Sequence, residues 1–305
     1  MPVRIIAFGA TVYQDGVDLS HERFYELLIE SDELPSTGQV NPYAYTQAYE
    51  EAVAAGEDIV VIALSSKLSG THQSAVTAAA QIDAPVRIVD TQSVTVGEHI
   101  LVKYALQLVD RGLGAQQIAD AIEAARDRVV VIGLLDTLEY LRRGGRISGA
   151  MGAVGEMLSI KPVVTVEDGE VHLMGKARGS KNGRNLLTKK IEEVGGVDFS
   201  MPIELGYAGL DDKLLRKYIA DSRALWEEYP GAELPVHSVG ATIGTHVGRW
   251  RFSRRSRTCP EARRSVSLQA NSLVAGGSEP ARGFFGIIYQ SIPVLLHALA
   301  WWGLL

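Results

Sequence analysis

Short apolar runs rich in β-branched residues alternate with helical patterns along the first half of the chain. The runs that predict buried strands are residues 59–64, 86–89 and 129–134. The segments with apolar residues at helical spacing are residues 42–55, 74–81, 97–109 and 115–126. Strands that alternate with helices in this way favour an α/β/α domain, with a mainly parallel sheet covered by helices on both faces.

The pattern changes after Gly155. Strand-like runs at residues 162–166 and 170–175 flank Asp168-Gly169, a dipeptide typical of a hairpin turn. The later segments are helical patterns at 181–194 and 211–229 and strand patterns at 202–207 and 235–239. We therefore expect an α+β second domain with a mixed or antiparallel sheet. The predicted division is an N-terminal domain at 1–158, a C-terminal domain at 159–248 and an atypical tail at 249–305.

The densest group of polar residues follows the strand predicted at 59–64. Residues 64–75 read Leu-Ser-Ser-Lys-Leu-Ser-Gly-Thr-His-Gln-Ser-Ala. A strand that ends in such a turn and opens into a helix presents hydroxyls and unpaired N–H groups to an anion. The residues suit a phosphate or a carboxylate equally well, and they match neither the Walker A nor the Gly-x-Gly-x-x-Gly pattern. An ordinary strand-to-helix turn with a capping serine is the structural alternative.

Composition narrows the classes of function. The chain has 305 residues, 46% hydrophobic and 22% charged, which is ordinary for a globular protein. The single cysteine excludes an internal disulfide framework and a cysteine-based zinc site. The seven histidines lack the spacing of common metal motifs, so we expect no metal and no cofactor. Residues 1–9 do not resemble a signal peptide, and we therefore expect a cytoplasmic protein.

Charge is distributed unevenly. The net charge is −6, yet residues 249–305 hold eight arginines and no lysine, so the rest of the chain is clearly acidic. An acidic body argues against general binding of nucleic acid.

Several motifs occur together in one order. They are residues 13–18 (Tyr-Gln-Asp-Gly-Val-Asp), 34–39 (Leu-Pro-Ser-Thr-Gly-Gln), 64–75, 138–148 (Leu-Glu-Tyr-Leu-Arg-Arg-Gly-Gly-Arg-Ile-Ser), 160–162, 168–169, 176–179 and 243–246 (Ile-Gly-Thr-His). In this order the chain resembles the DegV family, whose members include the FakB-type fatty acid-binding proteins. The resemblance extends over roughly residues 3–248.

The resemblance implies a two-domain DegV-like fold and a function in lipid binding. A long-chain fatty acid would be held with its acyl chain in an apolar tunnel and its carboxylate in a polar cluster. The residues that match the family's head-group site are Thr37, Ser65, Ser66, Arg178 and His246. A FakA-like, DAK-domain fatty acid kinase would then phosphorylate the bound carboxylate, so this chain itself is expected not to be an enzyme. Any membrane contact would be transient at most.

The residues alone leave alternatives open for each of these positions. Thr37 also suits a plain turn, Arg178 a solvated surface charge and His246 an exposed loop. Arg142, Arg143 and Arg146 surround a Gly-Gly pair, which is typical of a helix C-terminus, and we interpret them as structural or as facing a partner. The candidate tunnel walls are Ile62, Leu68, Val94, Leu134, Ile160 and Val163.

An enzyme is the alternative function. It would act on a small phosphorylated or carboxylated ligand at the turn that runs from Ser65 to Thr71. A serine nucleophile needs a paired base, and His72 follows Ser69 by three residues without an evident acid to orient it. A short polar pocket with a perturbed base near Ser65 would favour this alternative, whereas a long apolar tunnel favours the carrier.

The chain departs from the family pattern at both ends. A first strand that normally precedes the segment near residue 4 is expected to be missing, and Gly38 and Val40 replace the usual serine and proline. We hypothesise that residues 249–305 are a frameshift product and disordered, since Arg-Trp-Arg-Phe read in a neighbouring frame can encode an apolar strand. Membrane anchoring by residues 284–305 is the rival hypothesis, and a degenerate, inactive protein is a third.

Overall fold

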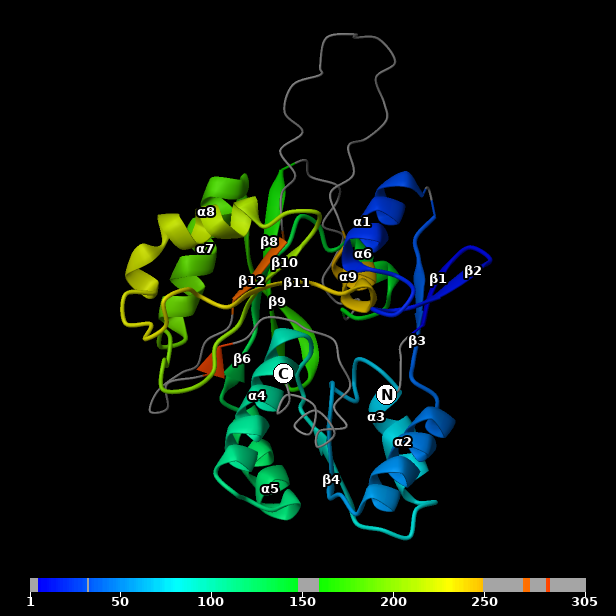
Figure 1. Ribbon diagram of the computed structural model, residues 1–305. Coiled ribbons are helices and arrows are strands. Elements are labelled where there is room, and N and C mark those ends of the chain that lie inside the picture. The colour runs from blue at the N-terminus through cyan, green and yellow to red at the C-terminus, as the bar shows by residue number, and fades with distance from the viewer. Residues whose placement is uncertain (1–4, 32, 148–158, 249–270, 275–283, 286–305) are drawn as a thin grey trace.

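The computed structural model spans the 305 residues and describes residues 5–31, 33–147, 159–248, 271–274 and 284–285 (Figure 1). The helices are α1 (His21–Glu30), α2 (Pro42–Ala55), α3 (Thr71–Ala79), α4 (Val96–Asp110), α5 (Ala115–Arg126), α6 (Glu139–Arg143), α7 (Ser180–Glu193), α8 (Lys213–Asp221) and α9 (Ala241–Val247). The strands are β1 (Ile5–Phe8), β2 (Thr11–Gln14), β3 (Ser36–Gly38), β4 (Ile59–Ala63), β5 (Val86–Asp90), β6 (Val129–Val130), β7 (Ile132–Leu134), β8 (Ile160–Glu167), β9 (Glu170–Arg178), β10 (Leu205–Ala208), β11 (Val236–Ser238), β12 (Asn271–Val274) and β13 (Phe284–Phe285).

Strand β4 shows why an all-apolar run is buried on both faces. It pairs in parallel with β5, and all five of its residues are buried. Val61 packs into a core with residues of α2 and α3, whereas Val60 and Ile62 pack into the larger core that includes residues of α4 and α5. Successive side chains on a strand point to opposite faces, so each face carries its own helices. The predicted parallel, two-sided α/β arrangement is confirmed.

Helix boundaries follow local capping chemistry. Helix α2 begins after Asn41, whose side chain accepts a hydrogen bond from Ala44 N at 2.9 Å, and it ends at Gly56 with φ of 72°. The predicted helix at 211–229 is wrong in its second half. Helix α8 ends at Asp221, and Ser222 Oγ donates to the carbonyl of Tyr218 at 2.7 Å. A side-chain hydrogen bond of this kind competes with the helical ladder.

The larger sheet has the order β11-β10-β12-β7-β8-β9. Strands β10 and β11 are parallel, and the other neighbours are antiparallel. The β8–β9 turn places Asp168 at φ of 49° and Gly169 at 78°, which suits the hairpin turn predicted from the Asp-Gly pair. The mixed sheet of the second half of the chain is therefore confirmed, and β7 from the first half joins it.

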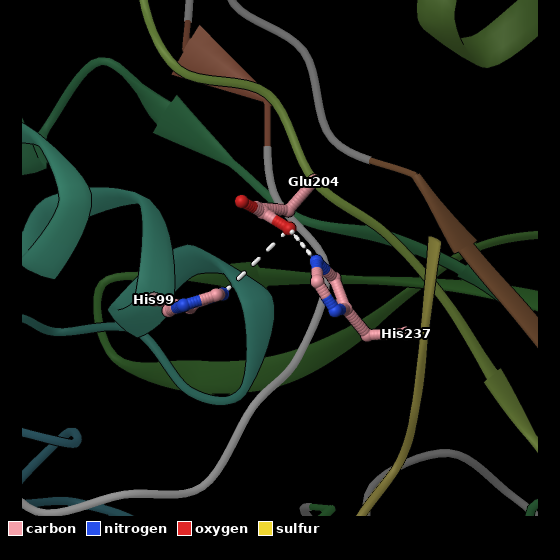
Figure 2. Close-up of side chains that lie close together, drawn as sticks. All are labelled: His99, Glu204 and His237. Carbon is pink, nitrogen blue, oxygen red and sulfur yellow. Dashed lines mark ion pairs between the residues drawn. The ribbon is translucent and has the colours of Figure 1, made fainter. Parts of the chain in front are cut away.

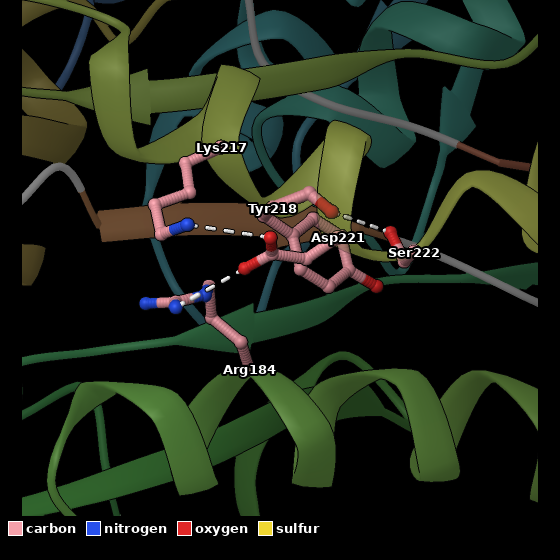
Figure 3. Close-up of polar contacts among 5 residues, drawn as sticks. All are labelled: Arg184, Lys217, Tyr218, Asp221 and Ser222. Atoms are coloured by element: carbon pink, nitrogen blue, oxygen red, sulfur yellow. Dashed lines mark hydrogen bonds and ion pairs between the residues drawn. The ribbon is translucent and has the colours of Figure 1, made fainter.

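Helices α7 and α8 lie beside this sheet, and one aspartate of α8 pairs with a cation from each helix (Figure 3). Asp221 Oδ2 lies 3.2 Å from Arg184 Nη2 of α7, and Asp221 Oδ1 lies 3.3 Å from Lys217 Nζ of α8. Asp221 is exposed, so solvent screens both pairs and they contribute little to stability. Most of the attachment of α8 comes from Leu215 and Tyr218, which are buried in the large core.

Parts of the fold lie beyond what the sequence patterns predicted. Strands β1, β2 and β3 form an antiparallel sheet, and α1 and α9 were also missed. In the tail, β12 pairs with β7 and β10, and β13 pairs with β6. The rest of 249–305 lies outside the described residues, as do residues 148–158, which include the predicted domain boundary near Leu158. The domain division and the frameshift hypothesis thus stay predictions.

Helix α9 is held by the first residues of the chain and lies beside α1, α6, β1 and β3 (Figure 1). The Asp15 carboxylate accepts hydrogen bonds from the backbone N–H groups of Ala241 and Thr242 at 3.2 and 3.0 Å, which caps the positive end of the helix. Tyr25 donates its hydroxyl proton to the Val239 carbonyl at 3.0 Å.

Among the described residues, no helix combines the length and the apolar character needed to cross a bilayer.

Candidate functional site

A cavity of about 230 Å³ opens between β3, the β4–α3 turn, the β7–β8 region and α9. Most of its wall is apolar: Leu64, Leu68, Val94, Val131, Leu135, Leu141, Val164, Val166, Val171, Ile243 and Val247. Polar side chains on the wall include Thr37, Ser69, Arg146 and His246. Of the proposed tunnel residues, Leu68 and Val94 line this cavity. An apolar wall with a few polar groups is typical of a site for an amphipathic small molecule.

Thr37 and His246 meet in this cavity although 209 positions separate them. Thr37 Oγ1 lies 3.1 Å from His246 Nε2. Thr37 is on β3, and His246 is on α9 rather than in the loop that one alternative assumed. Gly144 makes the approach of the imidazole possible, since a Cβ at that position would lie 2.4 Å from His246 Nδ1. The predicted convergence of Thr37 and His246 is thus present in the structure.

His246 sits in an environment that opposes its protonation. Burial lowers the pKa of His246 to about 4, and the charge of Arg146 lowers it further in the same direction. The imidazole is therefore neutral near neutral pH. Its Nδ1 is buried and has no hydrogen-bond partner among the described residues. A neutral imidazole beside a threonine hydroxyl and a guanidinium forms a cationic cluster without any acidic side chain on the cavity wall.

Arg146 is the residue that the sequence interpretation placed elsewhere. Helix α6 ends at Gly144, and Gly145 has φ of 69°, so the chain reverses and brings the Arg146 side chain to the cavity. Arg146 Nε donates to the Leu68 carbonyl at 3.2 Å, and Nη1 donates to the Gly144 carbonyl. The Gly-Gly pair was correctly interpreted as the end of a helix. The chain reversal at such an end also sets the direction of the next side chain, and this signal for Arg146 was missed.

Ser65 and Ser66, which were assigned to the head-group cluster, do not line this cavity. Ser65 is fully buried and donates its hydroxyl proton to the Gly169 carbonyl at 2.7 Å. Ser66 is exposed, and its backbone N–H donates to the Asp90 carboxylate at 3.2 Å. Ser69, four residues after Ser65, lines the cavity instead. The turn after β4 has to reverse before its hydroxyls reach the cavity, which the residue types alone do not reveal.

Arg178 also lies away from the cavity wall. It ends β9, opposite Ile160 in the register, and its side chain is exposed. The cation at the cavity comes from the α6 motif instead. Among the residues that line the cavity, His246 is the one side chain with a usual metal-ligating group, so the cavity itself offers no metal-ligand set.

Comparison with known proteins shows the family to which this chain is related. Residues 1–253 match the family model described as "Uncharacterised protein, DegV family". A DegV domain-containing protein of Clostridium perfringens is 34% identical over 248 residues, which cover 78% of this chain and 83% of that protein. A DegV domain-containing protein of Deinococcus radiodurans is 32% identical over 247 residues, covering 80% of this chain and 85% of that protein.

Solved structures share the fold. The fatty acid-binding DegV family protein of Thermus thermophilus is 27% identical, with a TM-score of 0.72 and coverage of 90% of both chains. The Fatty Acid Kinase (Fak) B3 protein of Streptococcus pneumoniae, loaded with linoleic acid, is 20% identical, with a TM-score of 0.70 and coverage of 89% of this chain and 88% of that chain. The ordered motifs, the mixed sheets and these matches lead to one conclusion: the chain belongs to the DegV family.

Proposed function

We propose that this protein binds a long-chain fatty acid, with the carboxylate beside Thr37, Arg146 and His246 and the acyl chain along the apolar wall. The observation that carries the proposal is the pairing of a cationic polar end with an apolar wall in one cavity. The fatty acid-binding relative of Thermus thermophilus and the linoleic acid-loaded protein of Streptococcus pneumoniae support it.

Each polar group has a distinct task in this proposal. Arg146 supplies the positive charge that offsets desolvation of a carboxylate. His246 is neutral, so it donates through Nε2 to Thr37 Oγ1 when its proton sits on that nitrogen, which leaves the Thr37 hydroxyl proton for the carboxylate. Hydrogen bonds to a charged group contribute about 1.5–3 kcal/mol each, and each buried CH₂ about 0.8 kcal/mol. The acyl chain thus supplies most of the affinity, and the polar end supplies the selection for an acid.

We assign the chemical step to a partner kinase rather than to this chain. The alternative enzyme needs a base beside Ser65, whereas the Ser65 hydroxyl donates to the Gly169 carbonyl. The Ser69 hydroxyl, at the cavity, lies 3.0 Å from Thr71 Oγ1, and a hydroxyl is not a general base. A fatty acid kinase of the FakA-like, DAK-domain type is the proposed partner, consistent with the name of the Streptococcus pneumoniae relative.

The first test is native mass spectrometry of the full chain purified from a bacterial host, followed by titration with oleate after lipid extraction. We expect a discrete added mass of one fatty acid.

Arg146→Met should weaken oleate binding roughly 10–100-fold, as expected for loss of one charge-assisted hydrogen bond. Arg142→Met is the matched control, because Arg142 is exposed on the same motif and does not line the cavity.

Oleyl alcohol separates the head-group claim from simple apolar binding. The wild-type chain should prefer oleate to the alcohol, and Arg146→Met should lose this preference while retaining the alcohol. Failure of the wild-type chain to take up oleate, or equal weakening by Arg142→Met, would overturn the proposal.

A further inference from the structure

A second polar cluster lies outside the cavity, formed by His99, Glu204 and His237 (Figure 2). His99 is on α4, Glu204 directly precedes β10, and His237 is on β11 beside it. Glu204 Oε2 lies 2.7 Å from His237 Nε2 and 3.6 Å from His99 Nδ1. Figure 2 shows both imidazoles directed at the same carboxylate. The three ligand atoms lie within 4.8 Å of one another.

The carboxylate of Glu204 is entirely buried, whereas its partners reach solvent. The Glu204 side chain has 0% exposure, against 22% for His99 and 33% for His237. Neither Glu204 oxygen, nor His99 Nδ1, nor His237 Nε2 has a well-aligned hydrogen-bond partner among the described residues. A buried charge without aligned hydrogen bonds is costly, so this group needs a cation close by.

Part of that need is met by Lys103, which follows His99 by one turn of α4 and contacts Glu204 Oε1. Burial raises the pKa of Glu204, but the contacts with His237, His99 and Lys103 outweigh it and hold the pKa at about 2. The carboxylate is therefore ionised at any ordinary pH. One oxygen faces the ammonium of Lys103, and the other faces two imidazole nitrogens.

We propose that His99, Glu204 and His237 form a binding site for a divalent transition-metal ion, with Zn²⁺ as the favoured ion. Two imidazole nitrogens and one carboxylate oxygen are the ligand set that Zn²⁺ takes when three protein ligands leave a fourth position to water. Softer metal ions favour sulfur ligands such as cysteine, and hard ions such as Mg²⁺ and Ca²⁺ take mainly oxygen ligands.

The distances suit an ion after a small adjustment. Zinc bonds of about 2.0–2.1 Å in a tetrahedron place neighbouring ligand atoms about 3.3 Å apart. The observed separations from Glu204 Oε2, 2.7 and 3.6 Å, lie on either side of this value. The partly exposed imidazoles give an ion a route from solvent. Because α4 precedes residue 158 and β10 and β11 follow it, a bound ion would join segments from both halves of the chain.

Titration of the metal-stripped full chain tests the site. We would measure Zn²⁺ binding by calorimetry and Co²⁺ binding by its visible absorption, for the wild type, His99→Ala, His237→Ala and the control His72→Ala, which lies outside the cluster. We expect one ion per chain in the wild type and the control. Each ligand variant should bind at least about tenfold more weakly, because even second-layer changes around metal ligands cost about 10–100-fold.

Lys103→Met provides an independent arm that keeps all three ligands. Removing the ammonium leaves Glu204 free to attract the ion, so this variant should bind Zn²⁺ more tightly than the wild type and should show a larger rise in Tm on addition of Zn²⁺. Unchanged or weaker binding in Lys103→Met would overturn the proposal, as would no binding by the wild type. Equal binding in all the histidine variants would place the metal elsewhere and overturn it as well.

Discussion

Two regions of this molecule that contain histidine have opposite charge balances. At the cavity, His246 lies beside Arg146 and Thr37 with no acidic residue on the wall, so the site needs an anion. At the second cluster, His99, His237 and Lys103 surround the buried carboxylate of Glu204, so that site suits a cation rather than an anion. The same side chain serves both, because an imidazole can be a neutral donor or a neutral ligand. The fixed charges around it decide which ligand it suits.

A third buried region already contains both charges and provides the reference for these two. Lys161 Nζ lies 2.5 Å from Asp136 Oδ1, with side-chain exposures of 8% and 7%. Burial raises the pKa of Asp136, and Lys161 opposes that shift. We propose no ligand for this pair, so we expect it to act on folding, whereas the two histidine regions are proposed to bind ligands.

The largest expected effect tests this complete pair. Lys161→Met leaves the Asp136 carboxylate buried without its ammonium, and breaking a buried pair in this way costs about 3–5 kcal/mol. Urea unfolding followed by circular dichroism gives the free energy of unfolding. Lys176→Met is the control, since Lys176 is exposed on β9. If Lys161→Met lowers the free energy of unfolding no more than the control does, the buried Asp136 carboxylate does not depend on Lys161 for its stability.

The next largest effect is the pH dependence of the free energy of unfolding, through His246 at the cavity. The pKa of His246 is about 4 in the folded chain against 6.5 for the free side chain, so the unfolded chain binds a proton that the folded chain resists. Stability is unaffected above about pH 6.5 and falls as the pH drops, by roughly 3 kcal/mol once the pH reaches about 4. Unfolding free energies at several pH values should show a shallower slope for His246→Gln than for the wild type. Identical slopes would contradict the assignment.

The smallest expected effects are those of two neighbouring glycine substitutions, one of which should change affinity and the other stability. Gly144→Ala places a methyl group 2.4 Å from His246 Nδ1, so the imidazole must move and fatty acid affinity should fall about tenfold. Gly145→Ala meets nothing within 4 Å but has φ of 69°, so it should cost about 1 kcal/mol of stability and leave affinity unchanged. Oleate titration and urea unfolding of both variants test this. A loss of affinity confined to Gly145→Ala would reverse our interpretation of the motif.

Local patterns determined much of the fold from the sequence alone. The apolar run at β4, the helix of α2 with Asn41 before it and Gly56 after it, and the Asp168-Gly169 turn are each encoded within a few neighbouring residues. Capping, periodicity and turn preference act over that same range, which is why these elements were predicted correctly. The order of the motifs likewise identified the family without any knowledge of the fold.

The membership of each site was decided by tertiary structure. Whether Ser65 or Ser69 faces the cavity depends on how the turn after β4 packs against Gly169, which lies 104 residues from Ser65. Arg146 rather than Arg178 lines the cavity, because the chain reverses at the Gly-Gly pair after α6. His99, Glu204 and His237 come from three distant segments and carry no joint spacing signal. Short-range preferences define elements, but only the packing of those elements brings distant charges together.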